Sequence, residues 1–274
     1  MPSSSDKSLP ERLAREVANS NLQGVREFYN SADASEQPDL LSGIATSAAG
    51  RAQIEILSWA FENGFQIPPE SLNNEFYDQA CQSHSLAVWK ALVEKGIDLN
   101  AYHSEYVGDA LSLEAYYGNI EIIRFLLENG QDPNSSWAYN DREPGVWALV
   151  GEKPSLEILR LLLDHGWKQE QSGVHIAAAE LGNMEALELL VDRGANLEQV
   201  EPWWYNPAVV DGDKWGTALY RAAYAGQESS VSYLLRRGAS ISFKDEGGRS
   251  IMWAAKQGGS RAVIKLLEDA GLQE

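Results

Sequence analysis

The stretch IEIIRFLLENGQDPN, residues 120–134, carries the pattern that decides the fold. Ile122 and Ile123 are followed one turn later by Leu126 and Leu127, a spacing that places all four on one face of a helix. The glycine that comes next is the residue that most often ends a helix in the left-handed conformation. The stretch therefore predicts a helix with one buried stripe and a glycine stop.

The same phrase recurs along the chain and always ends in a glycine. The other copies are IEILSWAFENG (54–64), LAVWKALVEKG (86–96), LEILRLLLDHG (156–166), MEALELLVDRG (184–194), SSVSYLLRRG (229–238) and AVIKLLEDAG (262–271). Successive glycines lie 32, 34, 36, 28, 44 and 33 residues apart, and such a period is typical of repeat proteins. A shorter alanine-rich helix precedes the phrase, most clearly in GTALYRAAYAG (216–226). The sequence predicts an all-α array of closely packed helix pairs.

Helix pairs of this period, followed by a GADVN-like sequence and a polar loop, resemble the ankyrin repeat. GQDPN (130–134) and GANLE (194–198) carry the match. The resemblance covers about residues 38–271, and a degenerate opening repeat over 9–37 extends it. It implies an ankyrin-repeat solenoid of about seven to eight helix-turn-helix repeats, with finger loops between them.

The predicted organisation is a single ankyrin-repeat domain over 9–274, preceded by a disordered N-terminal tail over 1–8. A long aromatic insertion, EQVEPWWYNPAVVDGD (198–213), accounts for the 44-residue interval between Gly194 and Gly238. It makes this repeat about eleven residues longer than the family's period.

Two departures from the family pattern are visible. The Thr-Pro-Leu-His opening of the first helix survives only as the run TALY, from Thr217 to Tyr220, and no repeat has the final histidine. In the family this threonine and histidine hydrogen-bond neighbouring loops, so their loss predicts loops that are looser or differently supported. Gly151 and Pro154 replace the usual alanine and glycine of another repeat, which predicts a short or bent first helix there.

Composition limits the classes of partner. Forty acidic and 22 basic residues give a net charge of −18, which repels phosphate backbones and favours a basic partner over nucleic acid; alternatively, the acids only keep the protein soluble. The lone Cys81 excludes an internal disulfide or a cysteine-based zinc site. The polar N-terminus and the lack of a long apolar run predict a soluble protein in the cytoplasm or nucleus, without a membrane partner. The chain is expected to be a monomer.

Partners of the ankyrin family generally bind the concave surface formed by the inner short helices and the finger loops. The loops of this chain are rich in aromatic residues. The predicted partner- or ligand-binding residues are Tyr102, His103, Tyr106, Trp137, Tyr139, Trp203, Trp204, Tyr205, Trp215 and Tyr220. Adjacent Trp203 and Trp204 are costly to leave in water, so they either bind a partner or fasten their own loop. The remaining tryptophans, Trp59, Trp89, Trp147 and Trp253, are expected to pack within the repeats.

Several titratable residues are predicted to face the same groove. They are Asp109, Glu114, Asp141, Arg142, His175, Glu180, Asp211, Asp213 and Arg221. His175 falls at the family's buried leucine position, where it is either a structural histidine or a general base among small alanines. His84, at a helix-linking glycine position, and His165, in an Asp-His-Gly turn, are expected to be structural. Zinc-binding histidine spacing and phosphate-binding glycine loops are absent from the sequence, so no metal or cofactor is expected.

Two functions remain open from the sequence. The first is a non-catalytic binding protein that presents an acidic, aromatic-rich concave groove to a protein or peptide with basic and apolar side chains. The second is a cofactor-free enzyme or carrier for an apolar small molecule, catalysing a cyclisation, isomerisation or elimination. The catalytic candidates of this second hypothesis are His175, Asp141, Arg142 and Tyr220.

Overall fold

The computed structural model describes residues 9–68, 75–101, 109–135, 143–170, 172–200 and 216–273. Within these ranges there are sixteen helices and one isolated β-bridge, between Lys244 and Ser250. In chain order the helices are α1 (Glu11–Ala18), α2 (Leu22–Ser31), α3 (Gln37–Gly50), α4 (Ile54–Glu62), α5 (Glu75–Gln82), α6 (Leu86–Glu94), α7 (Ala110–Tyr117), α8 (Ile120–Glu128), α9 (Pro144–Val150), α10 (Leu156–Asp164), α11 (Val174–Leu181), α12 (Met184–Asp192), α13 (Ala218–Tyr224), α14 (Glu228–Arg236), α15 (Ile251–Gly258) and α16 (Arg261–Asp269). They form eight pairs of a first and a second helix, which confirms the predicted all-α repeat fold.

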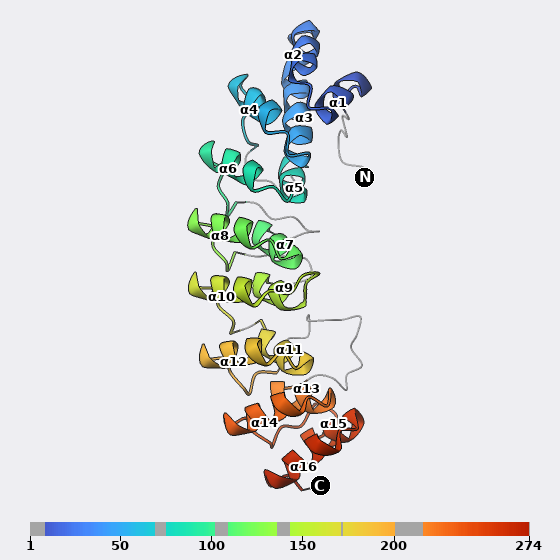
Figure 1. Cartoon of the computed structure of the whole chain (residues 1–274), viewed down its shortest axis with the longest axis vertical. Helices are drawn as coiled ribbons and strands as arrows, with labels where there is room; N and C mark the ends of the chain where they lie inside the picture. The colour runs from blue at the N-terminus through green and yellow to red at the C-terminus, as the bar shows by residue number, and fades with distance from the viewer. Residues whose placement is uncertain are drawn as a thin grey trace. The chain divides into compact units, whose positions relative to one another are not determined.

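The chain divides into two compact units, one over 1–114 and 121–135, the other over 115–120 and 136–274. In the second unit, the first helices α9, α11, α13 and α15 contact one another in order, and the second helices α10, α12, α14 and α16 form another layer (Figure 1). The first unit has the same arrangement, with α1, α3 and α5 in one layer and α2, α4 and α6 in the other. We call these the first-helix layer and the second-helix layer. The predicted single-domain organisation stays a prediction.

The seven glycines predicted to end the second helices all adopt the left-handed conformation, with φ from +79° at Gly96 to +97° at Gly64. The glycine N–H donates to the carbonyl three residues earlier, as from Gly130 to Leu127 at 3.1 Å. No heavy atom lies within 4 Å of the position that a Cβ would take at any of the seven. The backbone conformation, rather than a lack of space, therefore requires glycine here.

A second left-handed residue links the two helices of most pairs. It is a glycine in the later repeats, for example Gly226 with φ +70°, but His84 takes the same role between α5 and α6 with φ +47°. Ser20 and Ala52 do so in the first two pairs. The predicted helix-linking position of His84 is confirmed.

The first helices can pack closely because alanines lie where they meet. Ala178 of α11 and Ala222 of α13 have no exposed surface, and these two helices are in contact. Trp59 and Trp89 are 6% and 2% exposed, which confirms their predicted place in the core, whereas Trp253 is half-buried. None of the described helices is long and apolar enough to cross a membrane.

The repeat containing Gly151 and Pro154 differs from the later repeats at the end of its first helix. This helix, α9, has seven residues, as α13 also does, but the chain turns into extended backbone at Gly151. A Cβ at this glycine would lie 2.6 Å from the carbonyl oxygens of Trp147 and Tyr116. Glycine is required there because the chain passes close to the ends of two first helices.

Gly145, in the first turn of α9, makes room for an indole ring from the end of the same repeat. A Cβ at this position would lie 2.1 Å from Cη2 of Trp167, which is 4% exposed. The indole N–H of Trp167 donates to the carboxylate of Glu143 at 3.0 Å, so the ring is held at both its apolar and its polar end. The Trp167 ring thus occupies the space that a side chain at position 145 would need.

We expect Gly145→Ala to lower the free energy of unfolding by about 1 to 3 kcal/mol, because the added methyl displaces the Trp167 ring. Alanine forms helices more readily than glycine by about 1 kcal/mol, so helix propensity alone would make the variant more stable. A measured loss of stability would therefore come from the clash with Trp167. Urea denaturation would measure the change. Equal stability of Gly145→Ala and the wild type would contradict the proposed packing.

Candidate functional site

Most of the predicted finger residues lie outside the residues that the structure describes. These are Tyr102, His103, Tyr106, Trp137, Tyr139, Trp203, Trp204, Tyr205 and Trp215, together with Asp141, Arg142, Asp211 and Asp213. The described candidates are His175, Tyr220, Asp109, Glu114, Glu180 and Arg221. The described part of the candidate site therefore consists of the first helices that follow the finger loops.

Consecutive first helices of the second unit are joined by side-chain pairs that we call the cross-repeat ladder. The pairs are Tyr116 with Trp147, Glu180 with Arg221, and Tyr224 with Trp253. In each pair, a residue at the end of one first helix meets a residue of the following one. Such pairs form because adjacent first helices run side by side, and they join α7 to α9, α11 to α13 and α13 to α15.

The aromatic members of the ladder are half-buried, so each ring packs on its neighbour and keeps a solvent-facing part. Tyr116 and Trp147 meet edge to face, with ring centroids 5.1 Å apart and planes at 89°. Tyr117 adds a second edge-to-face contact to Tyr116, at 5.0 Å. Edge-to-face pairs are favourable beyond their buried area, so these rings are fixed in orientation. Fixed, half-exposed aromatic rings are the kind of group that anchors a partner.

The middle pair of the ladder is ionic. The Arg221 guanidinium donates to the Glu180 carboxylate, and the two side chains are 10% and 31% exposed. Because both side chains are mostly shielded from water, breaking this ion pair costs more than breaking a surface ion pair. Both predicted groove residues are thus brought together, and each neutralises the other.

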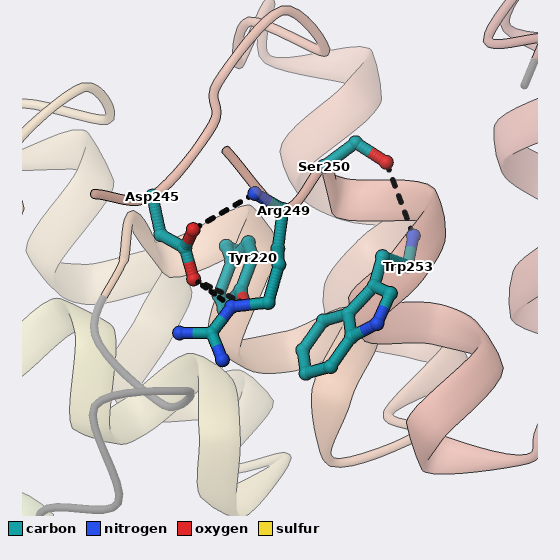
Figure 2. Close-up of polar contacts among 5 residues, drawn as sticks. All are labelled: Tyr220, Asp245, Arg249, Ser250 and Trp253. Atoms are coloured by element: carbon teal, nitrogen blue, oxygen red, sulfur yellow. Dashed lines mark hydrogen bonds and ion pairs between the residues drawn. The ribbon is translucent and has the colours of Figure 1, made fainter. Parts of the chain in front are cut away.

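The finger before α15 is held by a polar cluster that Figure 2 shows. The Tyr220 hydroxyl donates to Asp245 Oδ2 at 3.3 Å, and Arg249 Nε donates to the same oxygen at 2.6 Å. The Arg249 backbone N–H donates to Asp245 Oδ1 at 2.8 Å. The guanidinium carbon of Arg249 lies 4.9 Å from the ring centre of Trp253, so one arginine connects the finger to the ladder.

This cluster shows how the loop is supported without the family's histidine. Tyr220 stands at the histidine position and uses its hydroxyl to hold Asp245, while Thr217 Oγ1 accepts from the Tyr220 backbone N–H and caps α13. Burial and the Asp245 carboxylate raise the pKa of the Tyr220 phenol. Tyr220 has no exposed surface, so it supports the finger from within.

His175 lies in α11 with no exposed surface, which agrees with the structural interpretation of its leucine-like position. Burial lowers its pKa to about 4, and the nearby Asn196 backbone opposes this to a lesser extent. Neither ring nitrogen has a hydrogen bond of normal geometry within the described parts of the chain. The imidazole is therefore neutral at pH 7 and enclosed by the repeat core.

The predicted acids of the first unit are also buried. Asp109 is 1% exposed and accepts from the Ser112 backbone N–H at 2.7 Å, as an N-capping residue would. Glu114 is fully buried, and its Oε2 lies 3.2 Å from Nδ1 of His84. Burial and these acids raise the pKa of the Cys81 thiol. Among the described residues, no group of three or more histidine, cysteine or acidic side chains could hold a metal ion.

Sequence reasoning missed Tyr116 and Tyr224 as site residues. A signal existed, because each stands two residues before the helix-linking glycine, in YYG (116–118) and YAG (224–226). Trp147 and Trp253 were expected only to pack, and the structure shows them packed but half-exposed. The ladder thus combines two predicted groove residues, two tryptophans expected to pack and two tyrosines for which the sequence analysis predicted no role.

Comparison with known families gives a match over more than half of the chain. The family described as "Ankyrin repeats (3 copies)" matches residues 111–201 and 174–273. Among curated proteins, the chain is 28% identical over 126 residues to the "Ankyrin repeat and KH domain-containing protein mask-1" of Caenorhabditis elegans. It is 24% identical over 188 residues to "Palmitoyltransferase AKR1" of Lachancea kluyveri. These matches cover 46% and 68% of this chain but only 5% and 20% of the two relatives.

Solved structures agree on the fold. The ankyrin repeat domain of human ASB11 superposes with a TM-score of 0.62 at 18% identity, covering 84% of this chain and 98% of that one. An ankyrin repeat domain from Acinetobacter baumannii AYE gives a TM-score of 0.57 at 22% identity, with the same coverage. At such identities the likeness establishes the fold alone.

We expect Tyr220→Phe to lower the free energy of unfolding by about 1 kcal/mol, because Asp245 loses one hydrogen bond. The edge-to-face contact of the ring with Phe243, at 5.4 Å, is kept. Hydrogen exchange should quicken at the backbone N–H groups of the finger over 245–250. Tyr224→Phe is the control, since that ring is half-exposed on the ladder. If both variants exchange alike, the hydroxyl does not support the finger.

We expect His175→Leu to change how stability depends on pH. Because burial holds the folded-state pKa of His175 near 4, below the ordinary 6.5, its neutral form stabilises the fold above pH 6.5, and that contribution is lost as pH falls toward 4. The wild type should lose about 2 kcal/mol relative to His175→Leu between pH 7.5 and pH 5. Urea denaturation of both proteins at each pH isolates this difference, since other groups titrate equally in the two. Parallel pH profiles would show that His175 is not buried as a neutral group.

Proposed function

The chain belongs to the ankyrin repeat family, and we propose that it is a non-catalytic binding protein whose first-helix layer holds a protein partner with basic and apolar side chains. The cross-repeat ladder is the observation that supports this most directly. It offers a row of half-exposed aromatic rings fixed by contacts between neighbouring repeats. A surface fixed before binding loses little conformational entropy when a partner arrives.

Charge supports a basic partner. The net charge of −18 attracts cationic surfaces and raises the rate of their encounter. On the ladder itself, the rings of Tyr116, Trp147 and Tyr224 can accept lysine or arginine groups over their faces. Arg221 is already neutralised by Glu180, so it does not repel such a partner.

The finger loops extend the same proposal. The segments that contain the predicted aromatic residues, 102–108, 136–142 and 201–215, directly precede α7, α9 and α13 in the sequence, and each of these helices contributes to the ladder. We propose that Trp137 and Trp203 add contacts to the same partner. Whether Trp203 and Trp204 bind or fasten their own loop is a question for mutagenesis.

The alternative of a cofactor-free enzyme receives no support from the described members of its candidate set. His175 and Tyr220 have no exposed surface, and a group that acts on a substrate must reach it. The other two candidates, Asp141 and Arg142, lie outside the described residues. Binding is the function that the half-exposed groups favour.

Selection of random displayed peptides against the immobilised full chain tests the proposal. We expect enriched peptides to combine lysine or arginine with aromatic or large aliphatic residues, and to bind more weakly as salt is raised. Trp147→Ala should weaken the best peptide by about ten- to thirtyfold, the usual loss at an aromatic anchor.

Glu185→Ala, on an exposed position of α12 in the other layer, is the matched control and should bind like the wild type. A double variant, Trp203→Ala with Trp204→Ala, separates the insertion from the ladder. Unchanged affinity in Trp147→Ala, or enrichment of acidic peptides, would refute the proposed surface or the proposed partner, respectively.

A further inference from the structure

A separate cavity lies in the first unit, between the turns that follow α4 and α6. Its volume is about 720 Å³, within the range of about 300 to 1,000 Å³ usual for small-molecule sites. Its described lining comes from Phe61 of α4, from the segments that follow α4 and α6, and from Tyr77 of α5. The cavity shares no residue with the cross-repeat ladder, so it is independent of the proposed function.

Three aromatic residues contribute to the lining of this cavity, beside Ile67, Pro68, Ile97 and Ala101. Phe61, Phe65 and Tyr77 line it, and Phe65 and Tyr77 are only 8% and 4% exposed. Phe61 and Phe65 lie 5.5 Å apart between ring centroids, and Phe76 packs on Phe65 at 5.1 Å from behind. These contacts fix the rings, so the cavity presents a preformed surface to an apolar group.

Two opposite charges lie at the cavity, three residues apart in the turn after α6. Lys95 places its ammonium 5.5 Å from the ring centre of Phe61, and Asp98 accepts from the Asn100 backbone N–H at 2.9 Å. Both residues are exposed, and within the described ranges neither forms an ion pair, with the other or with any third residue. The cavity therefore offers one cation and one anion whose charges are not neutralised.

From these features, we infer that the cavity binds a small zwitterion with an apolar body, the chemistry of a free aromatic α-amino acid. The ligand carboxylate pairs with Lys95, the ligand ammonium pairs with Asp98, and the ring packs on Phe61 and Phe65. A purely anionic ligand would leave Asp98 unpaired beside it, and a purely cationic one would do the same to Lys95. Repulsion between the ligand and the residue of like charge would oppose binding, whereas a zwitterion pairs with both Lys95 and Asp98.

Binding of L-phenylalanine to the full chain tests this inference, with L-phenylalaninamide and N-acetyl-L-phenylalanine as matched probes that each lack one charge. Titrations in about 0.15 M salt, followed through the backbone amide resonances of residues 95–98, would give the affinities. We expect the wild type to bind the zwitterion at least fivefold more tightly than either analogue.

Two conservative variants test which ligand group pairs with Lys95 and which pairs with Asp98. Lys95→Met keeps the alkyl stem over Phe61 and should abolish the preference over the amide while keeping the preference over the N-acetyl compound. Asp98→Asn keeps an acceptor for the Asn100 N–H and should show the reverse pattern. Lys90→Met, at an exposed position of the preceding helix α6, is the control for the lysine. Asp132→Asn is the control for the aspartate, because Asp132 accepts from the Asn134 backbone N–H in the equivalent turn of the next repeat.

The inference fails if L-phenylalanine causes no saturable shifts up to about 20 mM, a concentration at which even a millimolar site would be mostly filled. It also fails if the three probes bind equally, or if either analogue binds best. Retention of both preferences in Lys95→Met and Asp98→Asn would place the ligand elsewhere. None of these outcomes bears on the cross-repeat ladder, whose test uses the other unit.

Discussion

Close packing between successive first helices is the constraint on which the rest of the second unit depends. It is possible because small side chains, such as Ala178 and Ala222, occupy the contact and leave no exposed surface. Once the helices lie this close, the end of one helix must meet the side of the next. The ladder pairs, the support of the last finger and the burial of His175 all follow from that one arrangement.

Much of the fold is predictable from the sequence, because its signals are local. The left-handed glycines and the apolar stripes each depend on fewer than a dozen consecutive residues, and even the unusual link at His84 is identified by its position. The ladder could not be derived in the same way. Glu180 and Arg221 are 41 residues apart, and their pairing depends on the register between two repeats of unequal length.

The candidate site that the structure describes differs in its residues from the predicted one. Aromatic residues were expected in the finger loops, whereas the half-exposed rings of Tyr116 and Tyr224 lie within helices. Tyr220 was a candidate contact, and the structure gives it a buried supporting role. Exposure decides between these roles, and one sequence does not reveal which face of a short alanine-rich helix remains uncovered.

The ladder also restricts how such a chain can evolve by gain or loss of repeats. Its pairs differ chemically, since aromatic residues meet at two of them and opposite charges at the third. Deleting the helix pair α11 and α12 would remove Glu180, and with it the ion pair that Glu180 forms with Arg221, which is 9% exposed. Breaking a mostly buried ion pair costs more than breaking a surface one. The repeats of this protein are therefore not interchangeable units, and recombination between them would be tolerated only where the ladder residues change together.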